Sequence, residues 1–181
     1  MFKNFDIKKY LKQKPRSNNS FDTLQEVKDL TKIPINKKFI KDNDNIEAAF
    51  KKVAKENGVK DYDETIASNI IEKSAPIILK LKKHFDRPRP KVIAKKNNIK
   101  MEDVEMASMK TPSYPSGHSV QGILIARVLS DKYPKAKKAF NKTGENISYS
   151  RRVARAHYKS DSKFGEQIGK DMYDHIKKGR R

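Results

Sequence analysis

The sequence predicts an all-α fold, a single-domain bundle of five to seven helices. Three observations support this prediction. Apolar residues recur at helical spacing in several segments, no segment alternates between apolar and polar residues as a strand would, and a length of 181 residues suits one domain. Hydrophobic and charged residues each make up 35% of the chain, so we expect a folded domain with a heavily charged surface.

The N-terminal segment, residues 1 to 20, is polar and irregular. We interpret it as an arm that precedes a domain spanning residues 21 to 181. The domain is expected to begin with a short amphipathic helix that Ser20 or Asp22 caps, and this helix should end before Pro34.

Two further helices are expected in the first half of the domain. Asp44 or Asn45 suits the start of one, and Gly58 suits the position just after its end. Asp61 or Asp63 can cap the next, which is long. Its apolar residues follow helical spacing, and they are Ile66, Ile70, Ile77, Leu81 and Phe85.

Prolines limit this long helix. Pro76 should kink or break it, and the helix must end near Asp86, because the following Arg-Pro-Arg-Pro sequence cannot continue it. Residues 91 to 114 are expected to form a long connection, with a short helix after Met101.

The C-terminal part is predicted to be helical throughout. A strongly apolar helix should start just after His118, and another should run from Lys135 to Asn141 until Gly144 breaks it. A segment from Ile147 to His157 should also be helical. The last helix, from Ser162 to Lys178, carries two glycines that permit close helix contact, and they are Gly165 and Gly169.

The formal net charge is +20, which favours capture of anionic ligands. Phosphorylated small molecules fit this charge, and so does weak association with nucleic acid or an anionic membrane surface. The alternative is a lysine-rich surface that only keeps the protein in solution. Because the chain has no cysteine, disulfides, thiolate metal sites and cysteine nucleophiles are excluded.

The sequence contains no predicted membrane segment. The N-terminal residues lack the run of about 7–15 apolar residues typical of a secretory signal. No segment approaches the roughly 18 apolar residues that span a bilayer. We therefore expect a cytoplasmic protein, and a periplasmic or secreted one only if a leader was removed.

Three separated segments concentrate residues suited to phosphate chemistry, namely Lys82 to Pro90, Pro115 to His118 and Ser150 to Asp161. Phosphoryl transfer without a metal needs several fixed donors around the equatorial oxygens. Arginine offers a planar fork, lysine a compact charge, and a glycine at a helix start an accessible N–H group. The candidate phosphate-binding residues are Lys82, Arg89, Ser116, Gly117 and Arg151.

Two histidines have separable candidate roles. His157 precedes Asp161 by four residues, so on a continuing helix the carboxylate would hold one imidazole nitrogen as N–H and leave the other as a nucleophile. His118 can protonate the leaving oxygen and later deprotonate the attacking water. His84 and His175 lie on charged helix faces, and we assign them no role.

Together the three segments resemble the type 2 phosphatidic acid phosphatase (PAP2) superfamily. Its pattern is Lys-x6-Arg-Pro, then Pro-Ser-Gly-His, then Ser-Arg-x5-His-x3-Asp, and this chain fills every position in order. Lys80 with Arg87 satisfies the first spacing as well as Lys82 with Arg89. We favour the second pair, because family members often carry another arginine two residues before the motif arginine. The two lysines also point about 200° apart on a helix.

The resemblance implies a mostly helical bundle with its site at helix ends. It implies that His157 is the nucleophile, His118 the general acid and base, and Asp161 the carboxylate that orients His157. No metal or other cofactor is implied. The expected protein is a soluble acid phosphatase-like member, a metal-independent phosphomonoesterase or pyrophosphate-cleaving phosphatase that forms a phosphohistidine.

Two alternatives belong to other functional classes. One is a vanadate-dependent oxidoreductase like the haloperoxidases of the same superfamily, which a halide-oxidation assay with added vanadate would reveal. The other is a nucleic-acid-binding protein with a vestigial site. Binding that weakens steeply with salt, without phosphatase activity, would support it.

Overall fold

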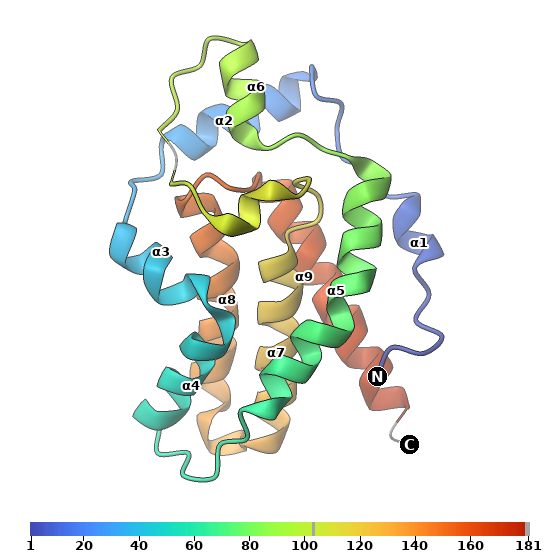
Figure 1. Ribbon diagram of the computed structural model, residues 1–181, viewed down its shortest axis with the longest axis vertical. Helices are drawn as coiled ribbons and strands as arrows, with labels where there is room; N and C mark the ends of the chain where they lie inside the picture. The colour runs from blue at the N-terminus through green and yellow to red at the C-terminus, as the bar shows by residue number, and fades with distance from the viewer. Residues whose placement is uncertain (103, 180–181) are drawn as a thin grey trace.

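The protein is all-helical, as the sequence predicts. A computed structural model describes residues 1–102 and 104–179, and within these ranges every regular element is a helix (Figure 1). In chain order the elements are α1 (Lys8–Leu11), α2 (Phe21–Thr31), α3 (Lys37–Asp44), α4 (Ile46–Glu56), α5 (Thr65–Phe85), α6 (Pro90–Lys96), the 3-10 helix η1 (Ala107–Lys110), α7 (Gly117–Lys132), the 3-10 helix η2 (Pro134–Ala136), α8 (Lys137–Val153) and α9 (Lys159–Lys178).

The described ranges contain nine α-helices, more than the five to seven expected. The additional ones, α1, α3 and α6, have 4, 8 and 7 residues, too few turns to show clear periodicity. The predicted long connection over 91 to 114 is wrong at its start, because Pro90 begins α6 and proline suits a first helical position. The short helix expected after Met101 corresponds to the 3-10 helix η1, which begins at Ala107; residues 104–106 are not helical, and residue 103 lies outside the described ranges.

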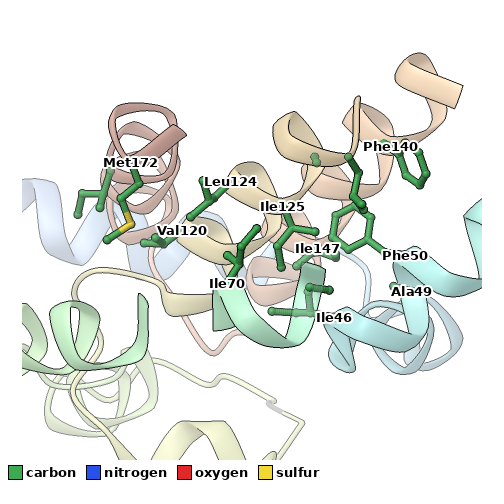
Figure 2. Close-up of a cluster of buried hydrophobic side chains, with 14 of the residues drawn as sticks. Ile46, Ala49, Phe50, Ile70, Val120, Leu124, Ile125, Phe140, Ile147 and Met172 are labelled. Atoms are coloured by element: carbon green, nitrogen blue, oxygen red, sulfur yellow. The ribbon is translucent and has the colours of Figure 1, made fainter. Parts of the chain in front are cut away.

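The core forms where α7 is enclosed by α4, α5, α8 and α9. Figure 2 shows apolar side chains from all five helices meeting around α7. Leu124 and Ile125 of α7 are completely buried, as are Phe50 of α4 and Ile147 of α8. Burial of this apolar surface is the main force that holds the bundle together.

Helix α5 runs without interruption from Thr65 to Phe85, with Pro76 inside it, and it changes direction partway along in Figure 1. The carbonyl that Pro76 leaves without a partner belongs to Glu72, which is exposed to water. The helix ends as predicted at Asp86, whose φ of 45° is left-handed. In the described part of the chain, no helix combines the length and the apolarity needed to cross a membrane.

Helices α7 and α8 cross at two glycines. The predicted break at Gly144 is wrong, because α8 continues through it. A Cβ atom on Gly144 would lie 2.7 Å from the Gly122 carbonyl oxygen and 2.8 Å from the Ala126 Cβ. Close packing of the two helices therefore offsets the low helix propensity of glycine.

Helices α7 and α9 also approach closely through glycine, as the sequence predicts. A Cβ atom on Gly165 would lie 2.6 Å from the Ser116 carbonyl oxygen, and one on Gly169 would lie 2.5 Å from the Val120 carbonyl oxygen. This contact fixes the start of α7 against the first turns of α9.

The N-terminal segment lies along α5 and α9 and is anchored by an aromatic residue. Tyr10 is completely buried, and its hydroxyl donates a hydrogen bond to Asp171 over 2.5 Å. Two histidines without a predicted role contact the backbone of this segment. His84 bonds to the Leu11 carbonyl oxygen and His175 to that of Lys3.

The glycine contact between α7 and α9 can be tested by Gly169→Ala. The added methyl group would collide with the backbone of Val120, which cannot rotate away, so the free energy of unfolding should fall by about 1–3 kcal/mol. Urea denaturation measures this change. Gly179→Ala is the control, because its Cβ would meet nothing closer than 3.7 Å. Equal stability of both variants would contradict the described packing.

Candidate active site

The predicted site residues converge at one end of the bundle, the upper end in Figure 1. Lys82 comes from the last turn of α5, and Arg151 from the last turn of α8. Ser116, Gly117 and His118 begin α7. The remaining predicted residues lie at the starts of α6 and α9, and they are Arg89, His157 and Asp161.

His157 and Asp161 form a buried pair. The His157 Nδ1 atom lies 3.1 Å from Asp161 Oδ2, and the Nε2 atom lies 2.9 Å from Nη1 of Arg89. Because an arginine N–H can only donate, Nε2 accepts this bond and Nδ1 carries the proton that His157 donates to Asp161. The imidazole is therefore neutral, with its lone pair on Nε2 directed toward the cationic side chains.

His157 and Asp161 do not share one continuous helix, which differs from the prediction. Helix α8 ends at Val153, Arg155 adopts a left-handed φ of 57°, and His157 lies in the turn before α9. Asp161 stands in the first turn of α9, and its carboxylate also accepts the Tyr158 backbone N–H over 3.1 Å. The start of α9 thus brings the carboxylate to the histidine.

A second arginine neutralises Asp161. Arg87 Nη1 donates to Asp161 Oδ1 over 2.7 Å, and its guanidinium group stacks 3.7 Å from the ring centre of Tyr158. The Ser113 hydroxyl also donates to this carboxylate. Burial raises the pKa of Asp161 to about 6, while Arg87 and Ser113 act in the opposite direction. From the sequence, Arg87 served only to identify the motif arginine, and its contact with Asp161 was not predicted.

Three buried cations surround the lone pair of His157. Lys82 is 5% exposed, Arg89 is 8% exposed and Arg151 is completely buried, whereas Lys80 is exposed to solvent. Of the two candidate lysines, only Lys82 therefore faces the cluster.

The segment around η1 supplies oxygen atoms to these cations. Lys82 Nζ donates to the Pro112 carbonyl over 2.6 Å, and Arg89 donates to the Ser108 and Thr111 carbonyls, each over 2.9 Å. Arg151 Nη2 donates to the Ser108 hydroxyl over 2.9 Å. In Figure 1 this yellow turn runs across the ends of α7 and α8. No sequence pattern signals these contacts, because they arise only from tertiary packing.

Burial and mutual repulsion disfavour charge on these side chains. The pKa of Lys82 is lowered to about 7, mainly by burial and further by Arg89 and Arg151. The pKa of Arg89 is lowered to about 10, again mainly by burial. A bound anion would relieve this repulsion, so the cluster is chemically suited to phosphate.

His118 lies in the first turn of α7. Its Nε2–H donates to the Asp44 carbonyl oxygen over 2.8 Å. Burial, and then Arg151, lower the pKa of His118 to about 4. The Asp44 carboxylate also accepts a hydrogen bond from Arg151 Nη1 over 2.9 Å. Asp44, the last residue of α3, therefore contacts both His118 and Arg151.

Ser116 and Gly117 shape the start of α7. The Ser116 hydroxyl caps the helix by accepting the Ser119 N–H over 3.3 Å. A Cβ on Gly117 would meet protein atoms only at ordinary distances, the nearest at 3.4 Å. Neighbouring side chains therefore leave room for a Cβ atom at this position. A ligand that approaches the backbone N–H would need the space that the absent Cβ leaves.

A chain of buried hydroxyl groups leads away from Ser116. The Ser119 hydroxyl lies 2.9 Å from that of Ser116 and 2.8 Å from that of Ser148, which is 2.6 Å from a carboxylate oxygen of Glu166. Ser150, although part of the motif, bonds only to the Ile147 carbonyl within its own helix. Across residues 1–102 and 104–179, no three His, Cys, Asp or Glu side chains are grouped to hold a metal ion.

Comparison with known proteins identifies relatives over this region. The family model of the PAP2 superfamily matches residues 65–169, more than half of the chain. A stretch of 88 residues, 49% of this chain, is 36% identical to a non-specific acid phosphatase of Salmonella typhimurium and 35% identical to one of Salmonella typhi. The match covers 35% of each relative, so the chain spans only about a third of their length.

The pKa of His118 predicts a pH effect on stability. A folded pKa of about 4, below the unfolded value of about 6.5, means that the unfolded chain binds more protons between these values. The stabilising contribution is thus present above pH 6.5 and is lost as the pH falls toward 4. From pH 7 to pH 5, wild type should lose on the order of 1–2 kcal/mol more unfolding free energy than His118→Gln.

Urea denaturation in phosphate-free buffer measures both proteins at the two pH values. The comparison with His118→Gln is needed because Asp161, whose pKa is raised, contributes the opposite pH dependence in both proteins. Parallel loss of stability in both would contradict a buried, neutral His118.

Proposed function

Because the chain belongs to the PAP2 superfamily, we propose that it is a metal-independent phosphatase that forms a covalent phosphohistidine on His157. One observation carries the proposal. The Nε2 lone pair of His157 faces a cluster of buried lysine and arginine side chains, while Asp161 holds the opposite nitrogen as N–H. This is the arrangement that a nucleophilic histidine needs beside a bound phosphate.

Binding places the phosphate among the cations. Its oxygens replace the carbonyl oxygens of the η1 segment as acceptors for the cationic side chains, and they accept further bonds from the start of α7. The proposed phosphate-binding residues are Lys82, Arg89, Ser116, Gly117 and Arg151.

In the first chemical step, His157 Nε2 attacks phosphorus and the bond from phosphorus to the leaving oxygen breaks. The electron pair of that bond goes to the leaving oxygen, which takes a proton from His118. Asp161 stabilises the positive charge that develops on the His157 ring. The negative charge of the bound phosphate raises the pKa of His118 above its value in the free site, which prepares it to act as an acid.

In the second step a water molecule attacks phosphorus. His118 takes a proton from this water, the bond between phosphorus and Nε2 breaks, and its electron pair returns to Nε2. Inorganic phosphate leaves and both histidines regain their starting states.

The proposed substrates are phosphorylated small molecules. The names of the two relatives support an acid phosphatase activity, and the proposal extends it to this shorter chain. The net charge of +20 supports faster capture of anionic substrates. Weak association with nucleic acid or anionic membrane surfaces through the same charge stays a prediction.

The nucleophile is tested by His157→Ala. The variant should lose at least about a thousandfold in release of phosphate from glycerol 2-phosphate, because no other group can form the intermediate. Rapid quenching of wild type with labelled substrate should trap an acid-labile phosphoprotein that the variant lacks. His84→Ala is the matched control, since His84 is exposed and its Nε2 bonds to the Leu11 carbonyl oxygen, away from the site. Turnover of the His157 variant near wild type would refute the mechanism.

Metal dependence gives an independent test. Activity should survive EDTA, because lysine and arginine provide the charge that a metal would otherwise supply. Vanadate should inhibit competitively, because its five-coordinate form resembles the transferring phosphoryl group. Steady-state phosphate release with each additive measures both effects. Loss of activity with EDTA that Mg²⁺ or Zn²⁺ restores would contradict the proposal.

A further inference from the structure

Asp44 lies outside all three motifs and outside the matched residues 65–169. It ends α3, and Asn45 then caps α4. Its side chain is 47% exposed, while Arg151, to which it bonds over 2.9 Å, is completely buried. Asp44 therefore stands between the buried cations and the solvent.

The Asp44 carboxylate also lies beside the proposed general acid. Its Oδ1 atom is 3.7 Å from Nε2 of His118, and its carbonyl oxygen accepts the Nε2–H over 2.8 Å. The nitrogen that carries the proton of His118 thus faces Asp44.

This position determines what the leaving group meets. In the proposed mechanism, on which this inference rests, the leaving oxygen takes the proton from His118 Nε2. It must come within hydrogen-bond distance of that nitrogen, beside the Asp44 carbonyl oxygen that accepts the Nε2–H without substrate. The atoms attached to the leaving oxygen then lie next to the Asp44 carboxylate.

We propose that Asp44 is a specificity-determining residue that disfavours substrates with an anionic leaving group. Pyrophosphate belongs to this class, since its leaving group is itself a phosphate. Substrates whose leaving group is a neutral or cationic alcohol, such as glycerol 2-phosphate or phosphoethanolamine, are favoured. The carboxylate repels an anionic leaving group, accepts hydrogen bonds from a neutral alcohol and attracts a cationic one.

The overall charge does not produce this discrimination. The +20 charge attracts every phosphate ester at long range, whichever part of it bears the negative charge. A charge near the leaving group is needed to discriminate between substrates with anionic, neutral and cationic leaving groups. The C-terminal end of α3 adds a partial negative charge at the same place.

The experiment compares kcat/KM for the three substrates in wild type, Asp44→Asn and Asp42→Asn. Releasing Arg151 from Asp44 changes phosphate binding for every substrate, so the ratio between substrates isolates the leaving-group effect. Asp42 is the matched control. It has the same charge on the same helix, is paired with Lys38 at the surface, and points about 200° away from Asp44.

In Asp44→Asn, kcat/KM for pyrophosphate relative to glycerol 2-phosphate should rise by about threefold to tenfold, the range expected for one partly exposed charge. The same ratio for phosphoethanolamine should fall, and Asp42→Asn should leave both ratios unchanged. Asp44→Ser should repeat the result, which keeps the test valid if one variant folds poorly.

Two results would overturn the inference. Ratios in Asp44→Asn that match those of wild type or Asp42→Asn would show that Asp44 only holds Arg151 in place. A wild-type protein that releases phosphate from none of the three substrates would refute the proposed function, and the inference with it. Phosphate release with unchanged ratios would refute the inference alone.

Discussion

The site is organised around one buried carboxylate, that of Asp161. It binds His157, Arg87, the Ser113 hydroxyl and the Tyr158 backbone N–H, so it joins three separate parts of the chain. A buried carboxylate without such partners would be unstable, and each partner is in turn fixed by its bond to the carboxylate. The same contact that positions His157 therefore also fixes the turn before α9 and the connection between α5 and α6.

Glycine packing sets the geometry around this carboxylate. Gly165 allows α9 to touch the backbone of Ser116, and the Ser116 N–H donates to the Asp161 carbonyl oxygen over 3.1 Å. The start of α7 and the start of α9 are thereby joined directly by their backbones. Both helix starts present N–H groups and positive dipole ends at one end of the bundle, beside the buried cations. The anion binding proposed for the site would therefore depend on this packing as much as on its side chains.

The sequence predicted which side chains form the candidate site better than it predicted where the helices begin and end. The motifs were recognised from residue types and their spacing, and the side chains chosen in this way do converge in the structure. The backbone predictions failed at Gly144 and at His157, where tertiary contacts override local propensity. At Gly144, α8 continues because it packs closely against α7. Before His157, the left-handed Arg155 follows the end of α8. Asp44 was expected only as a possible helix start, where Asn45 is the actual cap, and Ser108 carried no pattern. Their contacts with Arg151 could not be predicted, because they join segments more than forty residues apart.

The site has two halves that come from different parts of the chain. The half that we propose binds phosphate comes from residues 65–169, where the family pattern lies, and its buried cations lie near His157. The outer half includes Asp44 from the segment before that region, which bonds to Arg151 and to His118. A phosphoryl group is the same in every substrate, so its half of the site can stay constant, whereas leaving groups differ. A short helix such as α3 can change its end residue without disturbing the core. If Asp44 acts as proposed, substrate preference can therefore vary in the outer half while the chemistry is kept.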